Sequence, residues 1–245
     1  MRYLLILVVL ASTTYADVQK DIVDPYVEVY TEHGVGAGTV IELDGESVIL
    51  TAYHVIKPAL VPRRQLFVTP FGVQEVEKGW QPVHATKQQD GKRTSVLCDV
   101  LFYTPLEEEG GRDLALLKPR ASIGSAAVLA TKPPKVGRDV WYIGTPGVHA
   151  HLEKSIVSRT DYNSSDNNFL LFSGSGWYGN SGGGVFHFEK GKHRLIGVTV
   201  RLASPSNPKS PVMAEPLDVI QDFLLRFKDA KRSKADSCRC EGPTG

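Results

Sequence analysis

A glycine-lined turn around one serine constrains this chain more than any other feature. Residues 174–183 read Gly-Ser-Gly-Trp-Tyr-Gly-Asn-Ser-Gly-Gly, which places Ser181 where backbone N–H groups can converge. Glycine at position 179 lets the main chain approach a carbonyl group, so the N–H groups of Gly179 and Ser181 could form an oxyanion hole. We therefore take Ser181 as the candidate nucleophile, although glycine-rich turns that contain a serine are also common between strands.

A serine nucleophile needs a histidine to take its proton, because the hydroxyl group alone reacts poorly near neutral pH. Residues 48–56 form an apolar, β-branched run that contains His54. We expect this histidine at the edge of a strand over residues 47–56, as the general base. The remaining histidines have no comparable setting and are expected in solvated loops or strands: His33, His84, His149, His151, His187 and His193.

The histidine in turn needs an acid to orient it. Asp113 stands directly before the short apolar run 114–117, where a partly buried carboxylate could hydrogen-bond the imidazole of His54. Asp90 and Asp99 also lie in the interval before the serine, and either could be the acid instead. We take Asp113, because only this aspartate opens an apolar strand.

Four short motifs follow one another along the chain. They are Gly-Ala-Gly-Thr-Val at 36–40, Thr-Ala-Tyr-His-Val at 51–55, Asp-Leu-Ala-Leu-Leu at 113–117 and Gly-Asn-Ser-Gly-Gly at 179–183. In this order they resemble the chymotrypsin-like serine proteases, and the HtrA/Deg-type and related viral or bacterial enzymes more than the digestive ones. The resemblance implies a serine endopeptidase that hydrolyses peptide bonds through an acyl-enzyme, with a triad of His54, Asp113 and Ser181.

The resemblance also implies an all-β fold of two six-stranded antiparallel barrels of the chymotrypsin type with a C-terminal α-helix. We expect a protease domain over 17–230, with barrels at about 34–130 and 135–215, a helix over 216–228 and a flexible tail over 231–245. Short β-rich runs predict the strands of the first barrel at 38–43, 47–56, 65–69, 96–103 and 114–118. Those of the second barrel are predicted at 139–143, 152–162, 169–172, 184–189, 195–202 and 211–215. Residues 72–93 are polar and are expected to form loop or hairpin excursions.

The substrate pocket follows from the same resemblance. Its walls would come from residues 175–178 and 199–202, with Ser175 near the base and Thr199 and Arg201 along one side. No acid occurs in either stretch, which argues against a preference for Lys or Arg. If Arg201 points into the pocket, an acidic residue is favoured before the cut; if it points out, Ser175 and Thr199 suit small or apolar residues.

Residues 1–16 have the pattern of a secretory signal peptide. A basic start is followed by the apolar run 4–11 and by the small residue Ala16, which gives a mature chain from Asp17 and a secreted or periplasmic location. The apolar run is shorter than the roughly 20 residues that span a bilayer, so we expect no stable membrane span. HtrA proteins usually carry a PDZ domain after the protease; the chain stops soon after the expected helix, so none is expected here.

Charge and composition limit the classes of partner and cofactor that we expect. The resemblance implies a polypeptide substrate, and a net charge of +1 gives no reason to expect nucleic acid or an acidic surface as a partner. No cofactor and no metal are expected, although His149, His151 and Glu153 alternate and could share a metal on one face of a strand. A catalytically silent peptide-binding relative and an acyl hydrolase acting on esters remain alternatives, and the oligomeric state is open.

Cysteine usage leaves two arrangements. Cys98, Cys238 and Cys240 form an odd set, so at least one has no partner within the chain. A bridge from Cys98 to Cys238 or Cys240 could tether the C-terminal tail, and three free thiols are the other possibility.

Overall fold

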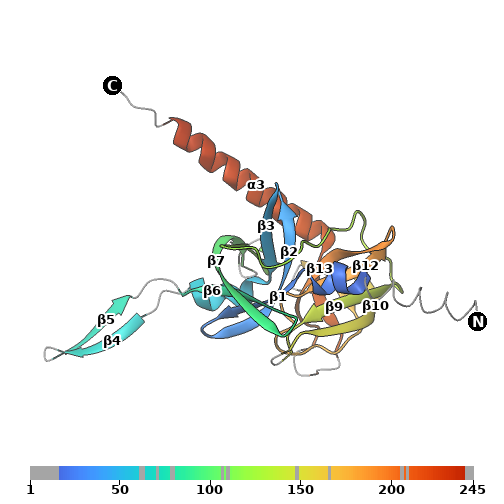
Figure 1. Ribbon diagram of the computed structural model, residues 1–245, viewed down its shortest axis with the longest axis horizontal. Coiled ribbons are helices and arrows are strands. Elements are labelled where there is room, and N and C mark those ends of the chain that lie inside the picture. The colour runs from blue at the N-terminus through green and yellow to red at the C-terminus, as the bar shows by residue number, and fades with distance from the viewer. Residues whose placement is uncertain are drawn as a thin grey trace, which may run out of the picture.

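Two closed antiparallel β-barrels form the body of the protein (Figure 1). The computed structural model describes residues 17–60, 64–69, 72–77, 81–105, 108, 111–146, 149–164, 167–204, 207 and 210–240. The predicted signal peptide, residues 1–16, lies outside the described residues. Each barrel has six strands, as expected from the sequence, and a long helix follows the last strand.

The first barrel closes in the order β1-β2-β3-β8-β7-β6. Its strands are β1 (Tyr26–Thr31), β2 (Gly34–Leu43), β3 (Glu46–Thr51), β6 (Val83–Gln89), β7 (Lys92–Thr104) and β8 (Leu114–Pro119). The second barrel closes in the order β10-β11-β14-β13-β12-β9. Its strands are β9 (Asp139–Gly144), β10 (His151–Ser164), β11 (Asn167–Phe172), β12 (Gly184–Glu189), β13 (Lys192–Leu202) and β14 (Val212–Pro216).

Three features of the first barrel differ from the sequence-based expectation. The run 65–69 is not a barrel strand: β4 (Arg64–Thr69) pairs only with β5 (Gly72–Glu77), in a hairpin that projects from the body (Figure 1). The barrel is completed by β1 and β6, which the sequence did not predict as strands. β6 belongs to the polar stretch 72–93, but an Asp90-Gly91 turn with positive φ at both residues joins it to β7. Five of its seven residues are polar, including the buried Thr86 and Lys87, so a search for apolar runs did not predict it.

The segment that carries His54 is helical rather than extended. β3 ends at Thr51 and the chain enters α2 (Tyr53–Ile56) and then a 3₁₀ turn, η2 (Lys57–Leu60). The strand predicted over 47–56 is therefore too long. β-branched residues suit a strand, and Val55 and Ile56 led to that prediction. Both side chains are buried in a hydrophobic core with residues of the first barrel, and here they reach it from one helical turn.

The C-terminal helix is longer than predicted. α3 runs from Leu217 to Cys240 and extends beyond the barrels (Figure 1), so the expected end of the helix at 228 is wrong. Residues 241–245 of the predicted tail lie outside the described residues. Its first turns bury Ile220 and Phe223, and Phe223 packs against Phe102 with ring centroids 5.2 Å apart. The later residues contain neither Gly nor Pro and are mostly good helix formers, which lets the helix continue in solvent.

The N-terminal segment is packed onto the second barrel. A short helical turn, η1 (Gln19–Val23), buries Ile22 completely. Asp21 accepts a hydrogen bond from the N–H of His193 at 2.9 Å, which fixes the turn to β13. Ile22 therefore belongs to the core shared by the two barrels.

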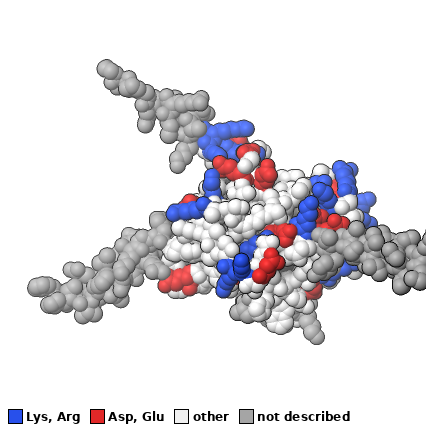
Figure 2. Space-filling model, viewed as in Figure 1, with Lys and Arg blue, Asp and Glu red and all other residues white. Residues whose placement is uncertain are grey.

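Charges of both signs are interspersed on the face shown in Figure 2. Exposed ion pairs of the described residues include Lys118–Glu46 at 2.8 Å and Lys228–Asp44 at 2.6 Å. None of the helices within the described residues is long and apolar enough to cross a membrane. Cys98 is buried and is described as a free thiol, whereas the side chains of Cys238 and Cys240, its predicted partners, lie outside the described residues.

Candidate active site

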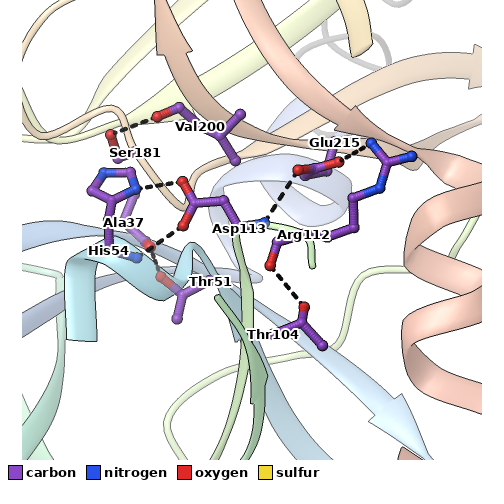
Figure 3. A network of polar contacts seen from close by, with 9 residues as sticks. All are labelled: Ala37, Thr51, His54, Thr104, Arg112, Asp113, Ser181, Val200 and Glu215. Carbon is purple, nitrogen blue, oxygen red and sulfur yellow. Dashed lines mark hydrogen bonds and ion pairs between the residues drawn. The ribbon is translucent and has the colours of Figure 1, made fainter. Parts of the chain in front are cut away.

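His54 and Asp113 are joined by two hydrogen bonds (Figure 3). The backbone N–H of His54 donates to Asp113 Oδ1 at 2.9 Å, and His54 Nδ1 lies 2.6 Å from Asp113 Oδ2. The histidine comes from α2 and the aspartate from the residue before β8, both in the first barrel. Of the acids considered from the sequence, Asp113 therefore contacts the imidazole, whereas Asp99 forms a surface pair with Arg120 at 2.6 Å.

Asp113 is buried, with 7% of its surface exposed, and its backbone is fixed from the second barrel. Its N–H donates to Oε1 of Glu215, on β14, at 3.2 Å. Oε2 of Glu215 lies 3.5 Å from Nη1 of Arg112. Figure 3 shows Glu215 and His54 on opposite sides of Asp113. Burial raises the pKa of Glu215 to about 7, and Arg112 opposes this shift.

Ser181 lies on the glycine-rich turn that joins β11 and β12 of the second barrel. Its carbonyl oxygen accepts a hydrogen bond from the N–H of Ala37 at 2.8 Å, which connects the turn to β2 of the first barrel. A Cβ atom on Gly36 would lie 2.8 Å from the same carbonyl, so glycine is needed for this close approach. The hydroxyl group of Ser181 donates to the carbonyl of Val200 at 3.4 Å (Figure 3).

Gly179 needs the conformational freedom of glycine for two reasons. Its φ angle is +97°, and a Cβ atom there would lie 1.9 Å from the carbonyl oxygen of Thr145. The carbonyl of Gly179 accepts a hydrogen bond from the N–H of Thr145 at 3.1 Å. Within the part of the chain that the structure describes, the N–H groups of Gly179 and Ser181 have no hydrogen-bond acceptor. Both groups are thus unpaired donors on the turn that carries the candidate nucleophile.

His54 and Ser181 line one cleft of about 490 Å³. Its other walls come from residues 176–178, Asn180, residues 199–202 and Val212. Tyr178 is 97% exposed at its rim. The cleft thus brings together residues of both barrels, as the sequence predicted for the active site.

The three predicted pocket residues differ in their positions. Thr199 and Arg201 line the cleft. Ser175 precedes the lining residue 176, and its N–H donates to the hydroxyl group of Tyr142 at 3.1 Å. The guanidinium of Arg201 stacks over the buried ring of Phe169, 4.8 Å from its centroid. The pocket roles of these residues stay predictions.

Several buried polar atoms of the cleft lack partners. Among the described residues, Oγ1 of Thr199, Nη2 of Arg201 and both polar atoms of the Asn180 side chain are buried without a hydrogen bond. Buried polar groups are nearly always paired in folded proteins. Four such atoms beside one cleft are therefore an unusual feature of this site.

The alternating residues considered as a metal site have other interactions. Nε2 of His151 lies 3.5 Å from Oε2 of Glu153, and this oxygen also accepts a short hydrogen bond from Tyr142. Among the described residues, no three His, Cys, Asp or Glu side chains are grouped so that they could hold a metal ion. Glu153 instead supports the turn before the serine, since its Oε1 accepts from the N–H of Ser175 at 3.3 Å.

Residues 36–198 match the family model of the trypsin-like peptidase domain. The chain belongs to this family. The matched segment contains the glycine-rich β2, His54, Asp113 and Ser181, and it ends in β13 at the edge of the cleft. No curated protein sequence matches the chain closely enough to count as a relative.

Solved structures of HtrA/Deg-type proteases share the fold of this trypsin-like peptidase domain. The serine endoprotease from Yersinia pestis superposes with a TM-score of 0.64 at 20% identity, over 87% of this chain and 66% of that one. The HtrA-type protease AlgW with a tripeptide gives 0.63 at 21% identity, over 86% and 63%. Deg5 gives 0.62 at 21% identity, over 86% and 92%. The chain thus spans less than two thirds of the length of the first two proteins.

Sequence reasoning missed two residues beside Asp113 in this trypsin-like peptidase domain. Glu215 is fully buried and Arg112 is largely so, yet neither was considered for the site. One signal was present, because Glu215 is a charged residue that ends an otherwise apolar strand before Pro216. Nothing in the sequence indicated that this strand would face Asp113 across the two barrels.

Proposed function

We propose that this domain is a serine endopeptidase that cleaves polypeptides through an acyl-enzyme. One observation carries the proposal: a histidine that makes two hydrogen bonds to a buried aspartate lines the same cleft as a serine on a glycine-rich turn. This arrangement of base, orienting acid and nucleophile suits acyl transfer. The family match supports the same reaction class.

The reaction would begin with attack of Ser181 Oγ on the carbonyl carbon of a peptide bond. His54 Nε2 takes the hydroxyl proton, while Asp113 holds the other ring nitrogen and stabilises the imidazolium. The unpaired N–H groups of Gly179 and Ser181 would donate to the oxygen that becomes negative. His54 then gives the proton to the leaving amine, and water hydrolyses the acyl-enzyme.

In the proposed reaction, the hydroxyl group of Ser181 has to turn from its observed acceptor toward His54. The Ser181 hydroxyl donates to the carbonyl of Val200 at 3.4 Å, a long and therefore weak hydrogen bond. Rotation about the Cα–Cβ bond would release it, at small cost, toward His54. Catalytic hydrogen bonds are often long or misaligned without substrate and tighten in the complex.

For specificity, we propose that a small or apolar residue precedes the cut. The guanidinium of Arg201 stacks on Phe169, and its electrostatic interaction with Glu215 offsets part of its charge, so we expect it to attract an acidic side chain only weakly. Much of the remaining lining is apolar, including Val200, Leu202 and Val212.

Digestion of a mixed peptide library tests both proposals. The chain from Asp17 is compared with its Ser181→Ala variant, and cleavage sites are read by mass spectrometry. Cleavage by the parent alone, after small or apolar residues, is expected. If folded parent cleaves nothing, the function is wrong and a catalytically silent peptide-binding protein replaces it; turnover of esters but not peptides would indicate an acyl hydrolase.

We further propose that the protein is exported and acts outside the cytoplasm. The support is the basic, apolar and small-residue pattern of residues 1–16. N-terminal sequencing of the protein recovered from expressing cells should give a chain that starts near Asp17. An intact N-terminus in the cytoplasm would contradict export.

A further inference from the structure

A buried carboxylate connects the second barrel to the catalytic acid of the first. Glu215 has none of its surface exposed and lies on β14, paired with Val198 of β13. It reaches across the interface between the barrels and accepts the N–H of Asp113 at 3.2 Å. The reaction described above uses the carboxylate of Asp113 but assigns nothing to its N–H group.

Burial of this carboxylate lowers the stability of the folded protein, so its presence calls for an explanation. Its neighbours on the strand, Met213 and Ala214, are buried apolar residues. Burial raises the pKa of Glu215 to about 7, and the charged groups that act on it are Arg112, Asp113 and Arg201. An apolar residue would fill the position at lower cost, since a buried charge is expensive even when it is paired.

The contacts around Asp113 indicate what Glu215 does. The Asp113 carboxylate accepts two hydrogen bonds from His54, while its N–H is fixed to Glu215 on the opposite side (Figure 3). The preceding carbonyl, that of Arg112, accepts a hydrogen bond from Thr104 at 2.7 Å. The peptide unit that carries the acid is thus held on both faces.

Arg112 completes this support. Its Nη1 lies 3.5 Å from Glu215 Oε2 and also donates to the carbonyl of Asn168, on β11, at 3.2 Å. The guanidinium therefore neutralises part of the buried charge and attaches the same peptide unit to a second strand of the second barrel. His54 and Asp113, both from the first barrel, depend for their position on these contacts with the barrel that carries Ser181.

We propose that Glu215, supported by Arg112, is a positioning residue that fixes Asp113 across the barrel interface and so sets the orientation of His54. The effect on catalysis rests on the proposed peptidase function, but the effect on the hydrogen bond between His54 and Asp113 does not. Glu215 exerts this effect through Asp113, apart from its electrostatic interaction with Arg201 of the cleft.

Two substitutions with side chains of similar length distinguish the loss of the hydrogen-bond acceptor from a change in packing. Glu215→Met fills the same space but cannot accept the N–H of Asp113, whereas Glu215→Gln keeps an acceptor oxygen. The matched control is Glu28→Met, because Glu28 is also a buried acid beside an arginine, Arg93 at 3.4 Å, on the outer part of the first barrel. This control measures the general effect of losing such a pair.

The first readout is peptide hydrolysis. Because small displacements of catalytic groups cost as much as about 10²-fold in rate, Glu215→Met should lower kcat by about 10- to 100-fold with little change in KM. Glu215→Gln should restore most of that loss, and Glu28→Met should keep the parent kcat. Thermal unfolding of all variants establishes that each is folded.

The second readout does not need activity. The proton on Nδ1 of His54, in its 2.6 Å contact with Asp113, should give a far-downfield proton NMR signal, assigned by its loss in His54→Gln. This signal should shift or broaden in Glu215→Met and return toward the parent position in Glu215→Gln. A change in the signal in a protein without peptidase activity would support the positioning role and contradict only the proposed function.

Three results would overturn the proposal. The first is a parent-like kcat and NMR signal in folded Glu215→Met. The second is an equal loss of kcat in Glu215→Met and Glu215→Gln. The third is a loss of kcat in Glu28→Met as large as that in Glu215→Met. If Glu215→Met does not fold, Arg112→Met replaces it, with the same signal and a smaller expected change in the same direction. An unchanged signal in folded Arg112→Met would likewise contradict the proposal.

Discussion

The first barrel holds His54 and Asp113 through side-chain hydrogen bonds, whereas the second holds Ser181 through main-chain contacts around glycine. His54 and Asp113 are joined at 2.6 and 2.9 Å, and Asp113 is buried. The serine turn is fixed by bonds between backbone groups, such as Ala37 N–H to Ser181 O at 2.8 Å, and its hydroxyl makes only a long contact.

This difference predicts how substitutions in each part of the site would affect activity and folding. The histidine and aspartate depend on charge and acceptor geometry, so conservative substitutions there should affect chemistry more than folding. The serine turn depends on the absence of side chains at Gly179 and Gly182, where a Cβ atom would lie about 2 Å from a backbone oxygen. Adding one methyl group there should affect chemistry and folding together.

The largest effect is expected for Ser181→Ala. Removal of the nucleophile should lower kcat by about 10⁶-fold, with residual catalysis from the remaining donors. The hydroxyl has only a weak contact, so the melting temperature should stay near that of the parent. Peptide hydrolysis and thermal unfolding measure the two effects, and activity retained within tenfold would exclude Ser181 as the nucleophile.

Asp113→Asn should reduce kcat by about 10⁴-fold, because the amide favours the wrong tautomer of His54. The variant keeps the shape of the side chain and should remain folded. Asp99→Asn, which alters the exposed pair with Arg120, is the control and should retain full activity. If the two variants behaved alike in a kinetic assay, Asp113 would not be the orienting acid.

Gly179→Ala tests whether the serine turn depends on the absence of a side chain at this position. The new Cβ collides with the carbonyl of Thr145, and movement of the peptide unit removes one oxyanion donor, which typically costs about 10² to 10³ in kcat. Gly91→Ala is matched in backbone conformation, with φ of +71° and open space around its Cβ. It should lose stability on the order of 1 kcal/mol and no activity. Equal kinetics for the two variants would contradict the role of Gly179.

The smallest effect concerns pH and Glu215. Because burial raises its pKa from 4.5 to about 7, the folded protein retains a proton that the unfolded chain has already lost. The free energy of unfolding should therefore fall as pH rises from about 4.5 to 7, by on the order of 3 kcal/mol, since one pKa unit corresponds to about 1.4 kcal/mol. Glu215→Gln should lack this slope in urea titrations across the range, and parallel curves would contradict the assignment.

The sequence predicted the second barrel more completely than the first. All six of its strands were expected, because their apolar runs are separated by clear turns. In the first barrel, β6 is polar on its exposed face and is recognisable mainly by its Asp90-Gly91 turn. The strand expected around His54 became helix α2, since β-branched residues that pack into a core are compatible with either element.

The order and chemistry of the motifs determined the candidate histidine, aspartate and serine, because these residue types and their glycine surroundings are local properties of the chain. Tertiary structure alone decided which acid reaches His54, where the Ser181 hydroxyl points and how Arg201 lies on Phe169. It also brought Glu215 to Asp113, two residues from different barrels. Such contacts join segments that are distant along the chain, and no local pattern specifies the distance between them.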